Sequence, residues 1–546
     1  MVNLTIIHDR EVPAGLFHQH VSLYRTRELS SEISIEDAED VISTDIKSDE
    51  PPMKLVIIDA EPSFYSISFS THNHAFFEAI TIPENSEVVQ KNFVYYSSPM
   101  SSSSDESSMI LEGVFQKSQS TGSPFGTITI LHVLPRALRI LEYFGMEYAM
   151  TASTILNLDP ATMRDIFRKA SARSIVSVEQ KVAQRPEYEI PDLIRDLKSI
   201  INLSSKIQYP TPLLSTTLSI IIEWQDTHPQ SYSVGYLGSP TLMHLHNREL
   251  HKPQSQRIVV VGLGIMGLGM ALSLQKLHHV TGCDIDQERL DEAKSASLPV
   301  TTDVASCLDK TDCLLFVLEK SEQILSVIGE ISSQLKSRRK ALVIIAHTTM
   351  SASSSIEIRD RIFQLNNTIS YLEAPISGGP NRANSGELLI ITGGERAVVE
   401  DKLSVLQQMS TTIYFAGRIG NASKMKALHQ ISAAINHASS FEITCLGLHC
   451  GIKSEILYDV LVKYAYNQYL ADRLPKFLAE DYTPDARLSI WLKDLEIARN
   501  QVSETEINLS IIDKLLFLFK KAAENGDVSN SDISIAQFWN CSLEEV

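Results

Sequence analysis

Cysteine is scarce in this chain, and its placement excludes two ways of organising a fold. The 546 residues contain six cysteines, all in the second half, with neither a C-x-x-C pair nor a Cys–His spacing typical of a metal site. We therefore expect neither a disulfide scaffold nor a bound metal ion, and we expect reduced thiols, as in a reducing compartment.

Long apolar runs and excess positive charge are also missing. No stretch of about eighteen uninterrupted apolar residues occurs, and the opening MVNLTIIHDREVPAG has charges where a secretory signal needs its apolar region. The formal net charge of −18 disfavours nucleic acid and anionic membrane surfaces as partners. These absences predict a soluble, cytoplasmic protein with no nucleic-acid or membrane partner.

A glycine-rich turn follows an apolar strand in the run RIVVVGLGIMGLGMA, residues 257–271. Four β-branched residues precede the first glycine, so a buried strand is expected to turn tightly into a helix. Such a turn brings backbone N–H groups and the helix N-terminus close to a pyrophosphate. The residues assigned to a dinucleotide cofactor on this pattern are Gly262, Gly264, Ile265, Met266 and Gly267.

An acidic residue ends the next apolar strand, HHVTGCDID. Asp284 stands about twenty residues beyond the first glycine of the turn, where an acid bonds the adenosine ribose hydroxyls of a dinucleotide. This position favours NAD over NADP as the cofactor. A solvated strand end is the alternative interpretation of the same residue.

The second half divides into an α/β part and a helical part. Apolar β-rich runs such as CLLFVLE and ALVIIAH alternate with helical segments up to about residue 420, a pattern typical of a parallel doubly wound sheet. Long amphipathic segments follow. The predicted fold class is therefore a Rossmann-type α/β dinucleotide-binding domain at 256–420, followed by an all-α substrate and interface domain at 421–546, with an interdomain linker near 245–256.

Three segments of the first half resemble three segments of the second half, and the distance along the sequence is nearly the same for each pair. LVIIDAEPS, LHVLPRALRILEYFGMEYAM and LIRDLKSI resemble LVIIAHTTMS, LHQISAAINHASSFEITCLG and WLKDLEIA in the same order. This predicts a degenerate internal repeat, with a truncated α/β region at 1–127 and an all-α domain at 128–250. Chance similarity among amphipathic helices is the alternative. Acidic and Ser-rich stretches at 28–50 and 97–108 are expected to be mobile loops.

The first copy lacks the residues that would make it active. It contains no Gly-x-Gly-x-x-Gly, and Thr129 and Arg195 stand where the second copy has Lys426 and Lys493. We therefore expect the first half to be catalytically inactive.

Four blocks in order carry a resemblance to a known family. GLGIMG, APISGGPNRANSGEL, KALHQ and the adjacent Lys493 and Asp494 resemble the β-hydroxyacid dehydrogenases, which include 3-hydroxyisobutyrate, tartronate semialdehyde and threonate dehydrogenases, with 6-phosphogluconate dehydrogenase as a relative. The resemblance covers about residues 256–530. It implies NAD-dependent oxidation of a hydroxyl group of a small hydroxy carboxylic acid. The sequence PNRANSGEL and the His-Gln pair are most similar to the threonate dehydrogenase branch of the family.

The resemblance also implies roles for individual residues, carried over position by position. Lys426 would be the general acid/base, Thr349 would lie near the nicotinamide of the cofactor, and Lys493 would lie against the cofactor or the substrate. The substrate-binding residues would be Ser377, Gly378, Gly379 and Gln430. Two departures stand out, because Ala422 replaces a usual glycine and the pair His429-Gln430 replaces the common Asn-Asn pair.

Elementary chemistry supports a lysine base and selects which lysine. Alcohol oxidation needs a base with a pKa near the working pH, and burial together with a neighbouring cation such as Lys493 lowers the pKa of a lysine. Lys426 shares a helix face with His429 and Gln430, whereas the rival Lys424 points roughly the opposite way. A solvated surface lysine is the alternative for either residue.

Other functions and assemblies remain open at this point. A catalytically inactive NAD(P)-binding scaffold and an imine or semialdehyde reductase of the same superfamily are the alternatives, and the presence of Lys426 counts against the scaffold. The helices at about 128–230 are expected to pack on those of the second half as an intramolecular pseudo-dimer. An ordinary homodimer is the other possibility.

Overall fold

The structure, a computed structural model of the chain, describes residues 2–7, 53–61, 64–70, 76–83, 92–97, 117–120, 127–179, 190–227, 255–484, 486–524 and 531–539. The acidic stretch at 28–50, the serine run after Ser97 and the predicted linker up to residue 254 lie outside these residues. None of the described helices combines the length and apolar character that crossing a bilayer requires.

The chain forms two compact units. One unit comprises residues 1–137, 443–464 and 541–546, and the other comprises residues 138–442 and 465–540. Every residue assigned to a site from the sequence lies in the second unit.

The first unit holds a six-stranded sheet whose strands follow one another in chain order. The outer pairs are parallel and the three central pairs are antiparallel. Its strands are β1 (Val2–Ile7), β2 (Met53–Glu61), β3 (Phe64–Ser70), β4 (Phe76–Pro83), β5 (Asn92–Ser97) and β6 (Lys117–Ser120).

This sheet differs from the truncated α/β region predicted for residues 1–127. Most of LVIIDAEPS lies on β2, which pairs antiparallel with β3, whereas its counterpart LVIIAHTTMS begins on a strand with parallel neighbours on both sides. Antiparallel neighbours need only a short turn between them, while parallel ones need a crossover. The described residues of this region therefore do not show α/β character, and the duplication of this part stays a prediction.

The second unit contains the predicted doubly wound sheet. Six parallel strands have the order β12-β11-β10-β7-β8-β9, so the strand order reverses between β7 and β10. In open α/β sheets a dinucleotide binds at this reversal, at the carboxyl ends of the strands. The strands are β7 (Arg257–Val261), β8 (His279–Cys283), β9 (Val300–Thr301), β10 (Cys313–Phe316), β11 (Leu342–Ala346) and β12 (Ile369–Glu373).

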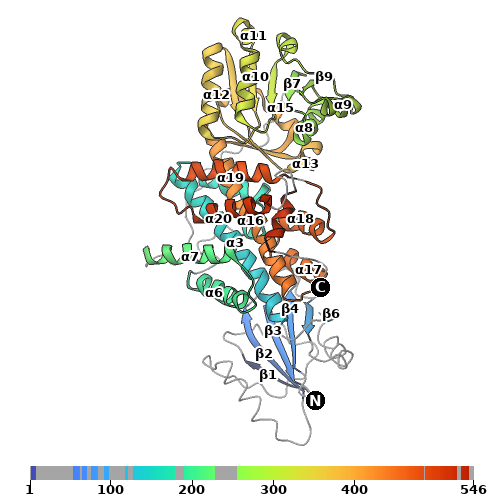
Figure 1. The fold of residues 1–546 in the computed structure, drawn as a ribbon, viewed down its shortest axis with the longest axis vertical. Coiled ribbons are helices and arrows are strands. Elements are labelled where there is room, and N and C mark those ends of the chain that lie inside the picture. Colours follow the sequence, from blue (N-terminus) through green and yellow to red (C-terminus); the bar gives the residue numbers. More distant parts are fainter. Residues whose placement is uncertain are drawn as a thin grey trace, which may run out of the picture. The chain divides into compact units, whose positions relative to one another are not determined.

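Both faces of this sheet are buried at its centre, which explains why the central strands β7, β10 and β11 are almost entirely apolar. Ile258 and Val260 point into one cluster, packed against α8 and α15, and Val259 and Val261 point into the other, packed against α10 and α12. Figure 1 shows these helices on the two sides of the sheet. The helices are α8 (Ile265–Gln275), α9 (Gln287–Ser295), α10 (Ser321–Glu330), α11 (Ser332–Ser337), α12 (Ala352–Leu365), α14 (Arg396–Asp401) and α15 (Leu403–Met409).

A small three-stranded sheet follows the six-stranded sheet in the chain. Strand β14 (Leu388–Thr392) pairs antiparallel with β13 (Ile376–Ser377) and parallel with β15 (Ser410–Phe415). The short helix α13 (Gly379–Ser385) connects β13 to β14 and packs against α8. Ser377 therefore ends a short strand directly before a helix.

The described residues contain two sets of five helices in which long and short helices come in the same order. The long helices α3 and α16 both have 29 residues, and each is followed by shorter helices. The first set is α3 (Thr127–Ile155), α4 (Pro160–Lys169), α5 (Ile175–Glu179), α6 (Ile190–Lys206) and α7 (Pro212–Thr227). The second set is α16 (Asn421–His449), α17 (Ser454–Tyr464), α18 (Gln468–Leu478), α19 (Leu488–Val502) and α20 (Ser510–Glu524). Helix α16 is buried on all sides from residue 425 to 448, as expected of a central helix.

The two sets meet through reciprocal hydrogen bonds. Ser174 pairs with Asn467 in an isolated antiparallel bridge. The N–H of Ile175 donates to the carbonyl of Tyr466, and the N–H of Gln468 donates to the carbonyl of Arg173. Residues directly before α5 thus contact residues directly before α18 in both directions, the pattern of a two-fold interface.

Candidate active site

The glycine turn after β7 has the geometry that close approach of a ligand needs. Gly262 has a φ of +97°, and a side chain there would collide with the carbonyl of Val317. A side chain at Gly267 would collide with the carbonyl of Gly262, so both glycines are required by the fold itself. At Gly264 a Cβ would meet only the guanidinium of Arg289, the far end of a flexible side chain that can move aside.

Apolar side chains stand exposed beside this turn. Ile265, at the start of α8, is 60% exposed, Ile285 is 95% exposed, and Met266 is half-buried. These side chains lie at the edge of the sheet where a dinucleotide binds in folds of this type, and they are available to contact it.

Asp284 lies at the same edge, where β8 ends. Its Oδ2 accepts a hydrogen bond from the N–H of Leu263 at 2.7 Å, and its Oδ1 accepts one from the N–H of Asp286 at 3.0 Å. The carboxylate is thus held beside the glycine turn by two backbone groups, and each oxygen retains a lone pair for a further donor.

Lys426 is buried on helix α16 and points along the helix to Gln430. Its side chain is only 6% exposed, and Nζ donates to Oε1 of Gln430, one turn later, at 2.8 Å. Burial is the main cause that lowers the pKa of Lys426 to about 8; the charge of Asp494 opposes this shift, and the charge of Lys493 adds to it. The predicted base is therefore an amine that loses its proton near neutral pH.

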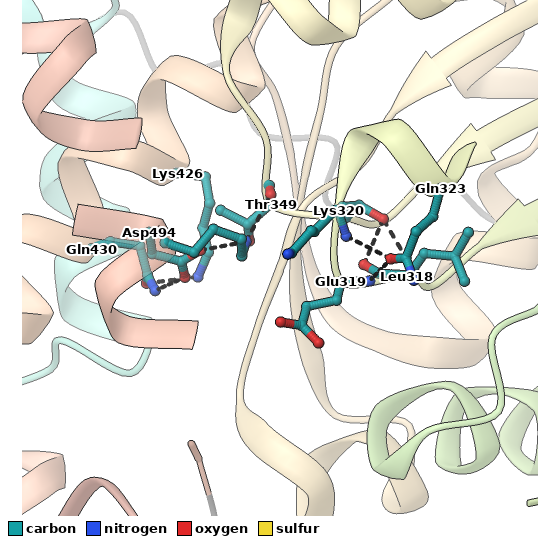
Figure 2. Close-up of polar contacts among 10 residues, drawn as sticks. Leu318, Glu319, Lys320, Gln323, Thr349, Lys426, Gln430 and Asp494 are labelled. Carbon is teal, nitrogen blue, oxygen red and sulfur yellow. Dashed lines mark hydrogen bonds and ion pairs between the residues drawn. The ribbon is translucent and has the colours of Figure 1, made fainter. Parts of the chain in front are cut away.

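A chain of hydrogen bonds connects this lysine to the strand ends. Nε2 of Gln430 donates to Oδ2 of Asp494 at 2.6 Å, and Nζ of Lys493 donates to Oδ1 of Asp494 at 2.7 Å. Lys493 also donates to the carbonyl of Thr349, just after β11, at 3.0 Å. Figure 2 shows the side chains of Lys426, Gln430 and Asp494 gathered beside Thr349.

The loop after β10 lies between Thr349 and the glycine turn. The hydroxyl of Thr348 donates to the carbonyl of Leu318 at 2.8 Å and accepts from its N–H at 3.2 Å. Oε1 of Gln323 accepts from the N–H groups of Glu319 and Lys320, so the loop is fixed on both sides (Figure 2). This loop was not identified from the sequence, although its position directly after a buried strand was a usable signal.

Ser377 and its glycines form the other predicted contact with substrate. Ser377 is 5% exposed, and Gly378 and Gly379 have φ of +142° and +72°, conformations that other residues rarely adopt. A side chain at Gly379 would meet nothing within 4 Å, so the backbone there faces open space. The turn can present N–H groups to an anion.

The rival lysine lies elsewhere. Lys424 lines a hollow of about 300 Å³ together with Arg359 and Arg418, and Lys426 is not among the residues that line it. The helix thus separates the two lysines, as its geometry predicts.

Comparisons with known proteins identify the second half. The NAD binding domain of 6-phosphogluconate dehydrogenase matches residues 257–417, and the family described as NAD-binding of NADP-dependent 3-hydroxyisobutyrate dehydrogenase matches residues 420–539. The C-terminal half of the chain belongs to the β-hydroxyacid dehydrogenase family. It is an NAD(P)-dependent hydroxyacid dehydrogenase whose cofactor is a nicotinamide nucleotide.

Individual relatives align with about half of this chain and nearly all of their own length. L-Threonate dehydrogenase of Cupriavidus necator is 28% identical over 284 residues, which is 51% of this chain and 95% of that enzyme. The L-threonate dehydrogenase of Pectobacterium atrosepticum is 25% identical over 298 residues, 53% of this chain and 96% of that enzyme. The structure of 3-hydroxyisobutyrate dehydrogenase from Salmonella typhimurium is 23% identical and covers 52% of this chain and 100% of its own, with a TM-score of 0.49.

Helix α16 of this β-hydroxyacid dehydrogenase begins on a buried carboxylate that the sequence did not reveal. Oε1 of Glu373 accepts from the N–H groups of Gly420 and Ala422 at 2.7 and 2.9 Å, and Oε2 accepts from the hydroxyl of Ser423 at 2.6 Å. Burial raises the pKa of Glu373, and the three donors oppose this shift. The carboxylate satisfies N–H groups that a helix start leaves unpaired.

Histidines in the dehydrogenase differ in what they contact. His347 is buried below the strand ends, where Nδ1 lies 2.7 Å from the carbonyl of Ala374, and burial lowers its pKa to about 4. Nδ1 of His429, by contrast, lies 3.1 Å from Oε1 of Gln430. His429 therefore touches the group that holds Lys426.

Residues of the first half also reach the dehydrogenase site, and no sequence motif predicted them. The N–H of Ser171 donates to Oγ of Ser377 at 3.1 Å, and the N–H of Ala172 donates to Nε2 of His429 at 3.2 Å. The predicted residues Thr349, Lys493, Gln430 and Lys426 thus lie along one series of hydrogen bonds. His429 and the neighbouring residues Ala172 and Ser171 lead from Gln430 to Ser377.

No group of three or more His, Cys, Asp or Glu side chains suited to a metal ion occurs among the described residues. No disulfide joins the five cysteines within those residues, which are Cys283, Cys307, Cys313, Cys445 and Cys450.

Proposed function

We propose that the chain oxidises a hydroxyl group of a small hydroxy carboxylic acid, threonate-like or 3-hydroxyisobutyrate-like, with Lys426 as the general acid/base. The buried hydrogen bonds from Lys426 through Gln430 to Asp494 support the proposal, because they hold an amine of lowered pKa beside the strand ends. Several relatives that match over most of their length are named L-threonate dehydrogenase, which favours a sugar acid as substrate.

Lys426, Gln430 and the turn at Ser377 have separate roles in the proposed reaction. In its neutral form, Nζ of Lys426 accepts the proton of the substrate hydroxyl, while the carbonyl oxygen of Gln430 holds Nζ in place. The hydroxyl of Ser377 and the N–H groups of Gly378 and Gly379 bind the carboxylate, which fixes the hydroxyl-bearing carbon relative to Lys426. A bound nicotinamide would supply the hydride acceptor for that carbon.

NAD is the proposed cofactor in preference to NADP. The carboxylate of Asp284 is held at the end of β8 by the N–H groups of Leu263 and Asp286. A fixed carboxylate there accepts hydrogen bonds from ribose hydroxyls and repels a 2′-phosphate.

The helices α3–α7 are proposed to occupy the place of a partner subunit. Two helical sets of matching order meet through reciprocal hydrogen bonds around Ser174 and Asn467, which supports an intramolecular pseudo-dimer. One chain would then form a complete catalytic unit with a single active dehydrogenase half.

A screen of C3 to C6 hydroxyacids with NAD and NADP tests the function, and two lysine variants test the mechanism. Lys426→Met is expected to lower kcat by about 10²- to 10⁴-fold, because a general base is lost, with an unchanged dissociation constant for NADH. Lys424→Met is the matched control and should stay within about twofold of the wild-type kcat. Wild-type turnover in Lys426→Met would remove the proposed base, and no oxidation of any acid by the unaltered chain would favour the scaffold.

A further inference from the structure

The short segment after α4 stands against the proposed substrate site although it belongs to the first half of the chain. The hydroxyl of Ser377 donates to Oγ of Ser171 at 3.0 Å, and the N–H of Ser171 donates back to Oγ of Ser377 at 3.1 Å. Ser171 is half-buried whereas Ser377 is buried, so Ser171 is the more open of the two hydroxyls.

The segment is fixed from several sides, so Ser171 has a defined place. The hydroxyl of Tyr414, on β15, donates to Oδ2 of Asp165 at 2.6 Å, and Arg382, on α13, donates to the carbonyl of Lys169 at 3.4 Å. Nδ2 of Asn436, on α16, donates to the carbonyl of Ala172 at 3.0 Å. Contacts thus come from both the α/β part and the helical part of the dehydrogenase.

The neighbouring Ala172 connects this segment to the lysine. Because a backbone N–H can only donate, Nε2 of His429 must accept from Ala172, which places the ring proton on Nδ1. Nδ1 then donates to Oε1 of Gln430, the same oxygen that holds Nζ of Lys426. Phe167 stacks on the His429 ring at 6.2 Å between centroids.

We propose that Ser171 is a substrate-binding residue supplied by the otherwise inactive first half, and that its hydroxyl and that of Ser377 together bind the carboxylate of the acid. Two hydroxyl oxygens 3.0 Å apart are close enough for each to donate to one oxygen of a single carboxylate. In the present arrangement the two hydroxyls bond to each other, and the carboxylate replaces that bond with two charge-assisted ones. This inference rests on the proposed function.

Four serine variants test the role of Ser171. Ser171→Ala removes one hydrogen bond to a charged group and should raise KM for the acid roughly tenfold. Ser171→Asp should raise KM more than a hundredfold, roughly, because it sets a negative charge beside the carboxylate. Ser171→Thr keeps a hydroxyl and should restore KM to about the wild-type value. Ser199→Asp, at an exposed serine on α6, is the matched control for the added charge and should leave KM unchanged.

Two further measurements separate the possible outcomes. The dissociation constant for NADH should be the same in all variants, which shows that the cofactor site is intact and the variants are folded. KM values of Ser171→Ala and Ser171→Asp equal to that of the control, in an enzyme that oxidises the acid, would overturn the role of Ser171 alone. Failure of the wild-type chain to bind or oxidise any acid while it binds NADH would overturn the proposed function, and this inference with it.

Discussion

The N–H of Ala172 donates to Nε2 of His429 at 3.2 Å, although 257 residues separate the two in the chain. This single bond decides the tautomer of a buried imidazole and so decides which group His429 presents to Gln430. A backbone atom of the first half thereby positions the oxygen that holds the proposed base.

Replacement of His429 tests this positioning role. His429→Phe removes the donor to Gln430 and should lower kcat roughly tenfold, since one hydrogen bond that orients the amide is lost. His429→Asn retains an N–H near the position of Nδ1 and should lose less. NADH affinity should be unchanged in both variants. Equal kcat in the phenylalanine variant and the wild-type chain would show that the imidazole only fills space.

The pH dependence follows from the lowered pKa of Lys426. The neutral amine forms as pH rises through about 8, so kcat/KM for oxidation should increase about tenfold per pH unit below that value and level off above it. The same shift means that the unfolded chain binds the proton more tightly between about 8 and the ordinary 10.5, so stability should rise with pH across this window.

The Lys493→Met variant tests the sign of the electrostatic interaction between Lys493 and Lys426. The positive charge of Lys493 lowers the pKa of Lys426, so its removal should move the pH profile to higher pH. Lys424→Met, a lysine on the other side of the helix, should leave the profile in place. A shift of the Lys493→Met profile to lower pH would contradict the arrangement of charges described here.

Glu373 is expected to stabilise the start of helix α16. Glu373→Ala leaves the N–H groups of Gly420 and Ala422 without their buried acceptor, which should cost about 2–4 kcal/mol of unfolding free energy in urea titrations. Glu373→Gln keeps an accepting oxygen and should cost about 1 kcal/mol. An alanine variant as stable as the wild-type chain would mean that water replaces the carboxylate.

Light scattering tests the proposed pseudo-dimer. If α3–α7 occupy the place of a partner, dilute protein should have a mass near 60.8 kDa. A mass of twice that value at low concentration would show an ordinary homodimer instead.

The parts of the site that the sequence predicted are those built from local patterns. The glycine turn and Asp284 follow from a strand, a turn and a second strand, and the contact of Lys426 with Gln430 follows from a spacing of four residues on a helix. Each of these depends on neighbours in the chain, so periodicity and turn chemistry suffice to locate it.

The missed parts depend on contacts between distant segments. Ser171 lies 206 residues before Ser377, on a short irregular segment with no period that a sequence could display. Glu373 is an acid at the end of an apolar strand. Its carboxylate is buried there because the start of α16 packs against it and supplies hydrogen-bond donors. The antiparallel sheet at β2–β5 was missed because apolar runs alone do not distinguish parallel from antiparallel pairing.

The bridge between Ser174 and Asn467 joins two helical sets that one polypeptide carries, with residues 228–254 in the connection between them. A tether of this kind makes docking a first-order event, with an effective concentration on the order of millimolar. The interface between the two helical sets therefore does not dissociate on dilution, and it needs a lower intrinsic affinity than an interface between separate subunits. With one competent nucleotide pocket for each tethered pair, saturation by NADH should be hyperbolic, with a stoichiometry of one.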